Sequence, residues 1–176
     1  EGYLEVCADA GTESLFDLLG GAPDTGGSWT DPSGNTVSQT LDPQTQDSGV
    51  YTYTLDGGVC PDASAEVEVV LHELPQVEIL GNASICDGNL ANLEMDLDGS
   101  GTWTVVYAID GEEQPPIITS DPDFELQTGE EGLYTILSVE DDHCVGTGNG
   151  NGTVSINDSP TAEISGQGAI CPGEEA

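Results

Sequence analysis

Apolar and polar residues alternate along several short segments of this chain. Within residues 65–71, Val67 and Val69 share one face, and Glu66 and Glu68 share the other. The same alternation runs through residues 93–97 and 103–109. A period of two is typical of β-strands with one buried face, and no segment sustains the 3.6-residue period of a helix. The pattern therefore predicts an all-β protein with acidic outer faces.

The same alternation predicts which side chains form the core. In the first half of the chain the inward-facing residues are Trp29, Tyr51, Tyr53, Val67 and Val69. In the second half they are Leu93, Met95, Trp103, Val105, Tyr134 and Ile136. Clusters of Gly, Asp and Asn separate the strands at roughly 8–12 residue intervals, which is typical of β-sandwiches.

Two segments of the chain are similar at a constant spacing. Residues 75–89 and 160–174 share a Pro, a Glu-Ile pair, a Gly and an Ile-Cys-x-Gly motif. Cys86 and Cys171 are 85 positions apart (171 − 86), and the other shared residues keep this spacing. A fixed period indicates tandem modules. We predict a first module with an incomplete N-terminal strand, a second module, and the first strand of a third module or a donor-strand tail: residues 1–74, 75–159 and 160–176.

A second shared motif stands before one strand of each module. Residues 47–51 and 130–134 each place an acid, a glycine and a tyrosine at positions i, i+2 and i+4. This arrangement resembles the tyrosine corner of immunoglobulin-type sandwiches, in which the phenol hydroxyl ties a loop to the following strand. Trp29 and Trp103 lie on an earlier strand of each module. The predicted fold is therefore all-β, with tandem immunoglobulin-like β-sandwich modules.

Several runs of sequence carry a resemblance to a known group of proteins. They are residues 15–34, 49–55 and 60–67 in the first module, and residues 85–88, 101–107 and 133–139 in the second. The runs resemble the Ig-like or PKD-like tandem modules of large secreted surface proteins of Bacteroidota. The resemblance implies a long, repetitive, exported protein that is displayed on the cell surface or released. It also implies a role in adhesion, matrix or filament building.

The charge of the chain excludes several classes of function. Its 176 residues include 34 acidic side chains and neither Lys nor Arg, which gives a formal net charge of −34. Nucleic acids and anionic membrane surfaces are bound through Lys and Arg, so neither is an expected partner. No run of about 18 apolar residues predicts insertion into a membrane. The expected companions of this polyanion are cations acting as counterions.

The acidic residues do not predict an enzyme. They occupy outward strand positions and turns, and no catalytic residue is predicted. His72 and His143 are expected to be exposed, and neither lies near a Ser in a nucleophile-elbow pattern. Calcium, which takes carboxylate and carbonyl oxygens, is the one cofactor under consideration, and the alternative is solvated turns with diffuse counterions. The candidate calcium ligands are Asp96, Asp98, Asp121, Asp123, Asp141 and Asp142.

The five cysteines follow the modular repeat. Each predicted module has one cysteine near its start and one after its tyrosine-bearing strand. These equivalent positions predict one disulfide within each module, Cys7–Cys60 and Cys86–Cys144, whereas Cys171 is expected to be unpaired or bonded outside this unit. Metal ligation is the weaker alternative, because the chain has no Cys-x-x-Cys motif. Disulfides predict an extracellular or cell-surface location.

Two functions remain in view. The favoured one is a non-enzymatic structural subunit of an extracellular filament or surface stalk, in which copies of the chain meet head to tail. The alternative is an adhesin-type module that binds carbohydrate or a partner protein. The low aromatic content, 5%, favours the structural function because most aromatic residues are assigned to the cores.

Overall fold

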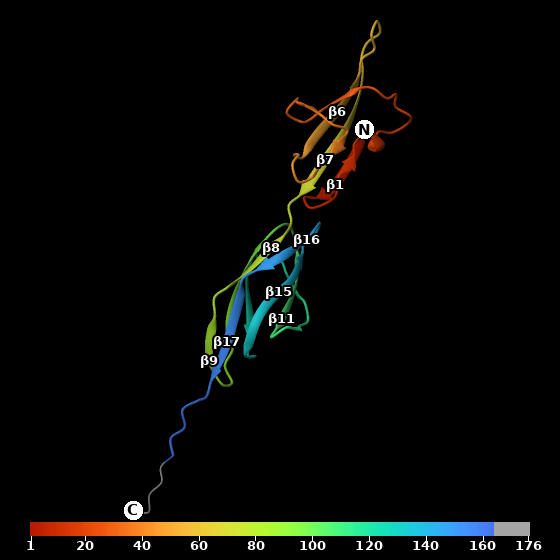
Figure 1. Ribbon diagram of the computed structural model, residues 1–176. Helices are drawn as coiled ribbons and strands as arrows, with labels where there is room; N and C mark the ends of the chain where they lie inside the picture. The colour runs from red at the N-terminus through yellow and green to blue at the C-terminus, as the bar shows by residue number, and fades with distance from the viewer. Residues whose placement is uncertain (164–176) are drawn as a thin grey trace, which may run out of the picture.

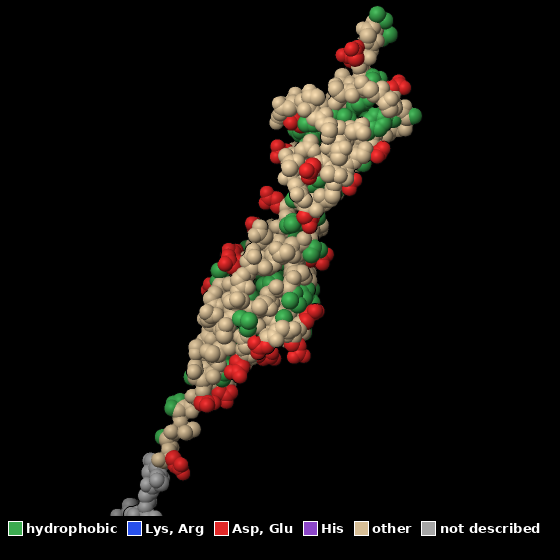
Figure 2. All heavy atoms as spheres, in the orientation of Figure 1, with side chains coloured by type: hydrophobic (Ala, Val, Ile, Leu, Met, Phe, Trp, Pro, Cys, Tyr) green, Lys and Arg blue, Asp and Glu red, His purple; other side chains and the backbone are tan. Residues whose placement is uncertain are grey.

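The computed structural model describes residues 1–163, which form two β-modules joined end to end into an elongated molecule (Figure 1). We call the part from β1 to β7 the N-terminal module and the part from β8 to β17 the C-terminal module. Each has its own hydrophobic cluster. Acidic side chains lie along the visible face of both modules, as Figure 2 shows.

The N-terminal module contains one five-stranded sheet and one strand pair. The sheet has the order β1 (Gly2–Cys7), β7 (Ala63–His72), β6 (Gly49–Leu55), β3 (Ser28–Thr30) and β4 (Thr36–Val37). The pair consists of β2 (Glu13–Ser14) and β5 (Thr40–Leu41), and the 3-10 helix η1 (Phe16–Leu18) follows β2. Strand β1 runs parallel to β7, and the other pairings are antiparallel.

The C-terminal module is more complete. One layer contains β8 (Gln76–Leu80), β10 (Ala91–Asp98) and β14 (Asp123–Thr128). The other contains β9 (Ala83–Cys86), β17 (Asn151–Asn157), β15 (Gly132–Glu140), β11 (Trp103–Ile109), β12 (Glu112–Glu113) and β13 (Ile117–Thr119). Strand β16 (Val145–Asn149) pairs with both β15 and β8, so it connects the two layers.

The predicted cores are almost entirely correct. Ten of the eleven predicted core side chains are buried, and Ile136 is partly buried against the same cluster. Glu66 and Glu94, which alternation assigned to the outer faces, are exposed. Because a one-residue slip would exchange the two faces of a strand, these exposures confirm the predicted strand registers.

Both tyrosine corners are present. The Tyr51 hydroxyl donates a hydrogen bond to the carbonyl oxygen of Asp47 at 2.9 Å. The Tyr134 hydroxyl donates to the carbonyl oxygen of Glu130, also at 2.9 Å. In each case the acceptor is four residues before the tyrosine, so the bond holds the loop against the strand that follows it.

The modules place their cysteines at equivalent positions. Cys7 ends β1 opposite His72, the last residue of β7, and Cys86 ends β9 opposite Asn157, the last residue of β17. We call Cys7 and Cys86 the first-strand cysteines. Cys60 lies in the β6–β7 hairpin and Cys144 lies in the turn between β15 and β16. We call these two the hairpin cysteines.

The disulfide differs from the predicted pairing. Cys7 is bonded to Cys144, with a Cα–Cα distance of 5.9 Å, so the bond joins the two modules. Cys60 and Cys86 are exposed, and neither is bonded to another cysteine of residues 1–163. The predicted pairs Cys7–Cys60 and Cys86–Cys144 are therefore wrong for this structure, and the prediction for Cys171 lies outside the described residues.

The direction of β1 explains why the predicted pairing fails. Because β1 runs parallel to β7, Cys7 lies at the end of β7, whereas Cys60 precedes its first residue. The ten residues of β7 rise about 3.3 Å each, so they hold the two cysteines roughly 30 Å apart. A disulfide requires Cα atoms about 4.4–6.8 Å apart. The same parallel arrangement of β9 and β17 separates Cys86 from Cys144.

Candidate functional site

The junction between the modules brings together three segments that are distant in the sequence. They are the end of β1, the end of β7 with residues 73–75, and the turn between β15 and β16. The ends of β1 and β7 belong to the N-terminal module, the turn belongs to the C-terminal module, and residues 73–75 connect the two modules. The backbones approach closely where the connecting residues meet the C-terminal module, since a Cβ atom on Gly146 would collide with the carbonyl oxygen of Pro75. Only glycine fits at that position without a shift of the chain.

Asp141 shapes the turn that reaches the N-terminal module. One carboxylate oxygen accepts the backbone N–H groups of His143 and Cys144, at 2.9 and 2.7 Å. The other accepts the backbone N–H of Ser100 at 3.0 Å. Partial burial opposes ionisation, but the N–H groups of Cys144, His143 and Ser100 hold the pKa of Asp141 below its ordinary value. The carboxylate thereby fixes the backbone that presents His143 and Cys144.

The only two histidines of the chain meet at this junction. The rings of His72 and His143 are stacked, with centroids 3.8 Å apart and planes 8° apart. Nε2 of His72 lies 2.8 Å from Oε1 of Glu5, and Nδ1 of His143 lies 3.4 Å from the same oxygen. The side chains are partly accessible, at 21% for His72, 36% for His143 and 41% for Glu5.

Glu5 is held from two sides. Its Oε1 faces His72, and its Oε2 accepts a hydrogen bond from the Tyr3 hydroxyl at 2.9 Å. The hydrogen bonds with His72 and Tyr3 lower the pKa of Glu5, and the bond to Glu5 raises the pKa of Tyr3. Within residues 1–163, Glu5, His72 and His143 form the only group of three potential metal ligands whose donor atoms all lie within 4.8 Å of one another.

Sequence reasoning placed both histidines at exposed positions and did not bring them together. Their meeting depends on the order in which the modules join, which alternation does not encode. One local signal was present, because His143 directly precedes Cys144 in the sequence. The pairing of His72 with Cys7 is visible only in the sheet.

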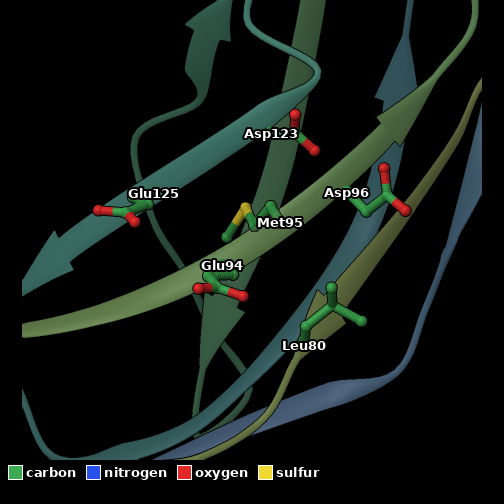
Figure 3. Close-up of a pocket in the computed structure, with 6 residues that line it drawn as sticks. All are labelled: Leu80, Glu94, Met95, Asp96, Asp123 and Glu125. Atoms are coloured by element: carbon green, nitrogen blue, oxygen red, sulfur yellow. The ribbon is translucent and has the colours of Figure 1, made fainter.

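The predicted calcium ligands lie in several places. Asp96 and Asp123 are opposite each other on β10 and β14, beside the opposed pair Glu94 and Glu125. Figure 3 shows these four carboxylates around a shallow pocket that Leu80 and Met95 also line. Like charges directly opposite each other on paired strands are destabilising, so this face favours nearby cations.

The other four predicted ligands are each engaged locally. Asp121 accepts the backbone N–H of Asp123, and Asp98 accepts that of Gly99. Asp142 accepts the N–H of Thr102 at 3.3 Å, and both oxygens of Asp141 are occupied by backbone N–H groups. The structure brings Asp96 and Asp123 together as neighbours and does not gather the six residues into one site.

Comparison with known proteins identifies the fold. Residues 75–150 match the family model for the Ig-like domain of nucleoporin POM152. An I-band fragment of titin superimposes with a TM-score of 0.53 at 16% identity, over 89% of this chain and 63% of that one. An E-to-A variant of the three-Ig titin fragment superimposes with a TM-score of 0.51 at 17% identity and with the same coverage of both chains. The N-terminal four Ig domains of Dscam1 isoform 1.9 superimpose with a TM-score of 0.41 at 18% identity, over 89% of this chain and 43% of that one.

The family model and the two titin fragments show an immunoglobulin-like fold. The chain spans less than two thirds of the solved structures it resembles, and none of the curated proteins matches it. Proteins with this fold generally serve as structural or binding modules, and Ig-like domains are commonly extracellular. None of the described segments is a helix that is both long and apolar enough to cross a membrane.

Proposed function

We propose that this chain is a structural repeat of an extracellular filament or surface stalk in which successive modules are locked end to end. The observation that carries the proposal is the bond between Cys7 and Cys144, which connects two folded modules across their junction. A disulfide within one module would stabilise that module alone. A disulfide between modules transmits force along the molecule and limits bending at the junction.

Because the two modules place their cysteines at equivalent positions, the same bond can form with a preceding module and with a following one. Cys86 occupies in the C-terminal module the position that Cys7 occupies in the N-terminal one. Cys60 lies in the hairpin position of Cys144. In this repeat, Cys86 bonds to the hairpin cysteine of a following module, and Cys60 bonds to the first-strand cysteine of a preceding module.

The positions of the two free cysteines support this arrangement. Both are exposed, and they lie toward opposite ends of the molecule, Cys60 beyond β6 and Cys86 at the end of β9 (Figure 1). Exposed thiols in an oxidising compartment pair with other thiols, and their placement at opposite ends favours a linear array over a closed dimer. In this proposal, other copies of the same chain supply the partner cysteines.

Controlled oxidation of the purified chain tests this function. Cys171 is replaced by Ser so that Cys60 and Cys86 are the only free thiols. We expect a ladder of linear multimers on non-reducing gels, with Cys60 joined to Cys86 in peptides produced by Glu-specific cleavage. The variants Cys60→Ser and Cys86→Ser should each stop the ladder. Symmetric Cys60–Cys60 or Cys86–Cys86 pairs, or a ladder that persists in either variant, would contradict head-to-tail linkage.

The alternative function, an adhesin-type module for carbohydrate or a partner protein, has less support. Such surfaces commonly present a group of exposed aromatic side chains. Among the exposed large hydrophobic residues of the described part, Tyr3 is the only aromatic one, and its hydroxyl is bonded to Glu5.

A further inference from the structure

We propose that Glu5, His72 and His143 bind one divalent cation of the kind that prefers imidazole ligands, with Zn²⁺ as the representative ion. Two imidazole nitrogens and one carboxylate oxygen are a donor set that zinc accepts, with a fourth position left for water. The ligands come from both modules, so the ion would join them a second time beside the disulfide. The site does not depend on the proposed filament.

Both distances from the Glu5 oxygen to the imidazole nitrogens are close to those that coordination requires, and all three donor atoms lie within 4.8 Å of one another. Zinc–ligand bonds of about 2.0–2.1 Å place tetrahedral ligand atoms roughly 3.3 Å apart. The separation of Glu5 Oε1 and His143 Nδ1 is 3.4 Å, and that of Glu5 Oε1 and His72 Nε2 is 2.8 Å. Binding therefore lengthens the second contact by about half an ångström. His72 then carries its proton on Nδ1 and presents the Nε2 lone pair to the ion.

One rearrangement follows from the ring geometry. Because the ring planes differ by only 8°, the in-plane lone pairs lie in two nearly parallel planes, whereas a shared ion requires both planes to pass through one point. The two rings must therefore tilt out of their stack. The partial exposure of His143 leaves room for this movement and for the ion to enter.

The surroundings hold the backbone segments of the three ligands close together before an ion arrives. Tyr3 fixes the second oxygen of Glu5, and Asp141 fixes the backbone of His143. The bond between Cys7 and Cys144 connects the neighbours of both histidines. Preorganised ligands lose little freedom on binding, so the affinity of the site should exceed that of three unconnected side chains.

The net negative charge of the chain attracts cations of every kind, and the type of ligand atom decides which ion binds at each place. The carboxylates on the outer faces favour hard ions such as Ca²⁺, which take oxygen ligands. The imidazoles favour Zn²⁺, Cu²⁺ and Ni²⁺. Because the chain has only two histidines and both are in this site, an excess of calcium should occupy the carboxylates and leave the junction available for zinc.

Histidine-selective ¹⁵N labelling observes both proposed nitrogen ligands without background from other imidazoles. Cys60, Cys86 and Cys171 are replaced by Ser in every sample so that no free thiol competes for the metal, and the oxidised chain is titrated with Zn²⁺ at slightly alkaline pH, in physiological salt with millimolar Ca²⁺. We expect both imidazole signals to shift together and to stop shifting at one zinc per chain. Calorimetry under the same conditions should give one zinc-binding event. Zinc uptake that leaves either imidazole signal unshifted, or that calcium abolishes, would overturn the proposal.

Substitutions separate this site from general binding to carboxylates. His72→Gln, His143→Gln and Glu5→Gln should each weaken zinc binding by at least about tenfold. Glu94→Gln removes the same charge as Glu5→Gln from an exposed position on β10 and should leave zinc binding unchanged. Near-ultraviolet circular dichroism of the buried tryptophans checks that each variant is folded. Wild-type affinity in the two histidine variants would overturn the proposal.

A double variant tests the role of preorganisation. Cys7→Ser with Cys144→Ser retains all three ligands and removes the bond between the modules, so zinc affinity should fall while both imidazoles still shift at saturation. Serine is used in place of a reducing agent because free thiolates would themselves bind zinc. Unchanged affinity in this variant would overturn the claim that the junction preorganises the site.

Discussion

Removing the intermodule disulfide should convert a fixed junction into a hinge. The perturbation is the double variant Cys7→Ser with Cys144→Ser. Without the bond, the covalent connection consists of residues 73–75 between β7 and β8. Three extended residues span at most about 10–11 Å, which is enough to allow wide bending.

The remaining contacts at the junction are weak. The contact of Glu5 with His143 at 3.4 Å is exposed and screened by solvent, so it contributes little to stability. The disulfide, by contrast, closes a sequence separation of 137 residues. If both modules unfold together, the chain-entropy relation gives a stabilisation of about 5 kcal/mol for that separation. We therefore expect the covalent bond to dominate both the stiffness of the junction and its resistance to unfolding.

The chain itself supplies the labelling sites for the assay. Cys60 and Cys86 are exposed and lie toward opposite ends of the molecule, so spin labels on them report the angle between the modules once Cys171 is replaced by Ser. Pulsed electron paramagnetic resonance should give a narrow distance distribution for the oxidised protein and a broad one for the double variant. Equally narrow distributions would refute the reasoning, because the noncovalent contacts would then suffice.

Three further predictions concern stability. Asp141→Asn should lower the free energy of unfolding in urea by about 1–3 kcal/mol. Folding lowers the pKa of Asp141, so the difference in free energy of unfolding between wild type and this variant should be largest above the ordinary aspartate pKa of about 4. The difference should vanish as the pH falls through the pKa of the folded state. A difference that persists in strong acid would contradict this. Tyr134→Phe removes the hydrogen bonds of this hydroxyl with the Glu130 carbonyl and the Thr128 hydroxyl, and it should cost at least about 1 kcal/mol. An unchanged urea midpoint would contradict a structural role for the corner. Added salt should raise the melting temperature by screening the repulsion between acidic side chains. A further rise that only calcium produces, and that disappears in the double variant Asp96→Asn with Asp123→Asn, would locate calcium on the outer face of β10 and β14.

The sequence predicted the fold and most of the core because those features depend on local pattern. Burial of alternate residues determined the strand registers, and the acid-glycine-tyrosine motif located both tyrosine corners. Ile136 is less buried than predicted. The pairing of Tyr107 with Ile136 follows an irregularity after Val106, where the register between β11 and β15 shifts. Simple alternation does not anticipate such a shift.

The junction could not be predicted in the same way. The repeat correctly identified two equivalent cysteine positions in each module, but equivalence allows a bond within a module or between successive modules. The choice depends on the direction of the first strand, because a parallel β1 carries Cys7 away from Cys60 and toward the next module. The meeting of His72 and His143 depends on the same arrangement, so the candidate metal site was missed together with the disulfide.

The charge of the chain and the position of its disulfide are physically connected. At physiological ionic strength, repulsion between exposed charges is largely screened beyond about 8 Å, so it acts across the junction and hardly along the whole molecule. Repulsion there opposes docking of one module on the next, and the chain has neither Lys nor Arg to form an ion pair across the gap. A covalent bond, a histidine or a bound cation can hold the junction against this repulsion. The structure places Cys7–Cys144 and both histidines at that position, so the groups able to oppose this repulsion lie where the modules meet.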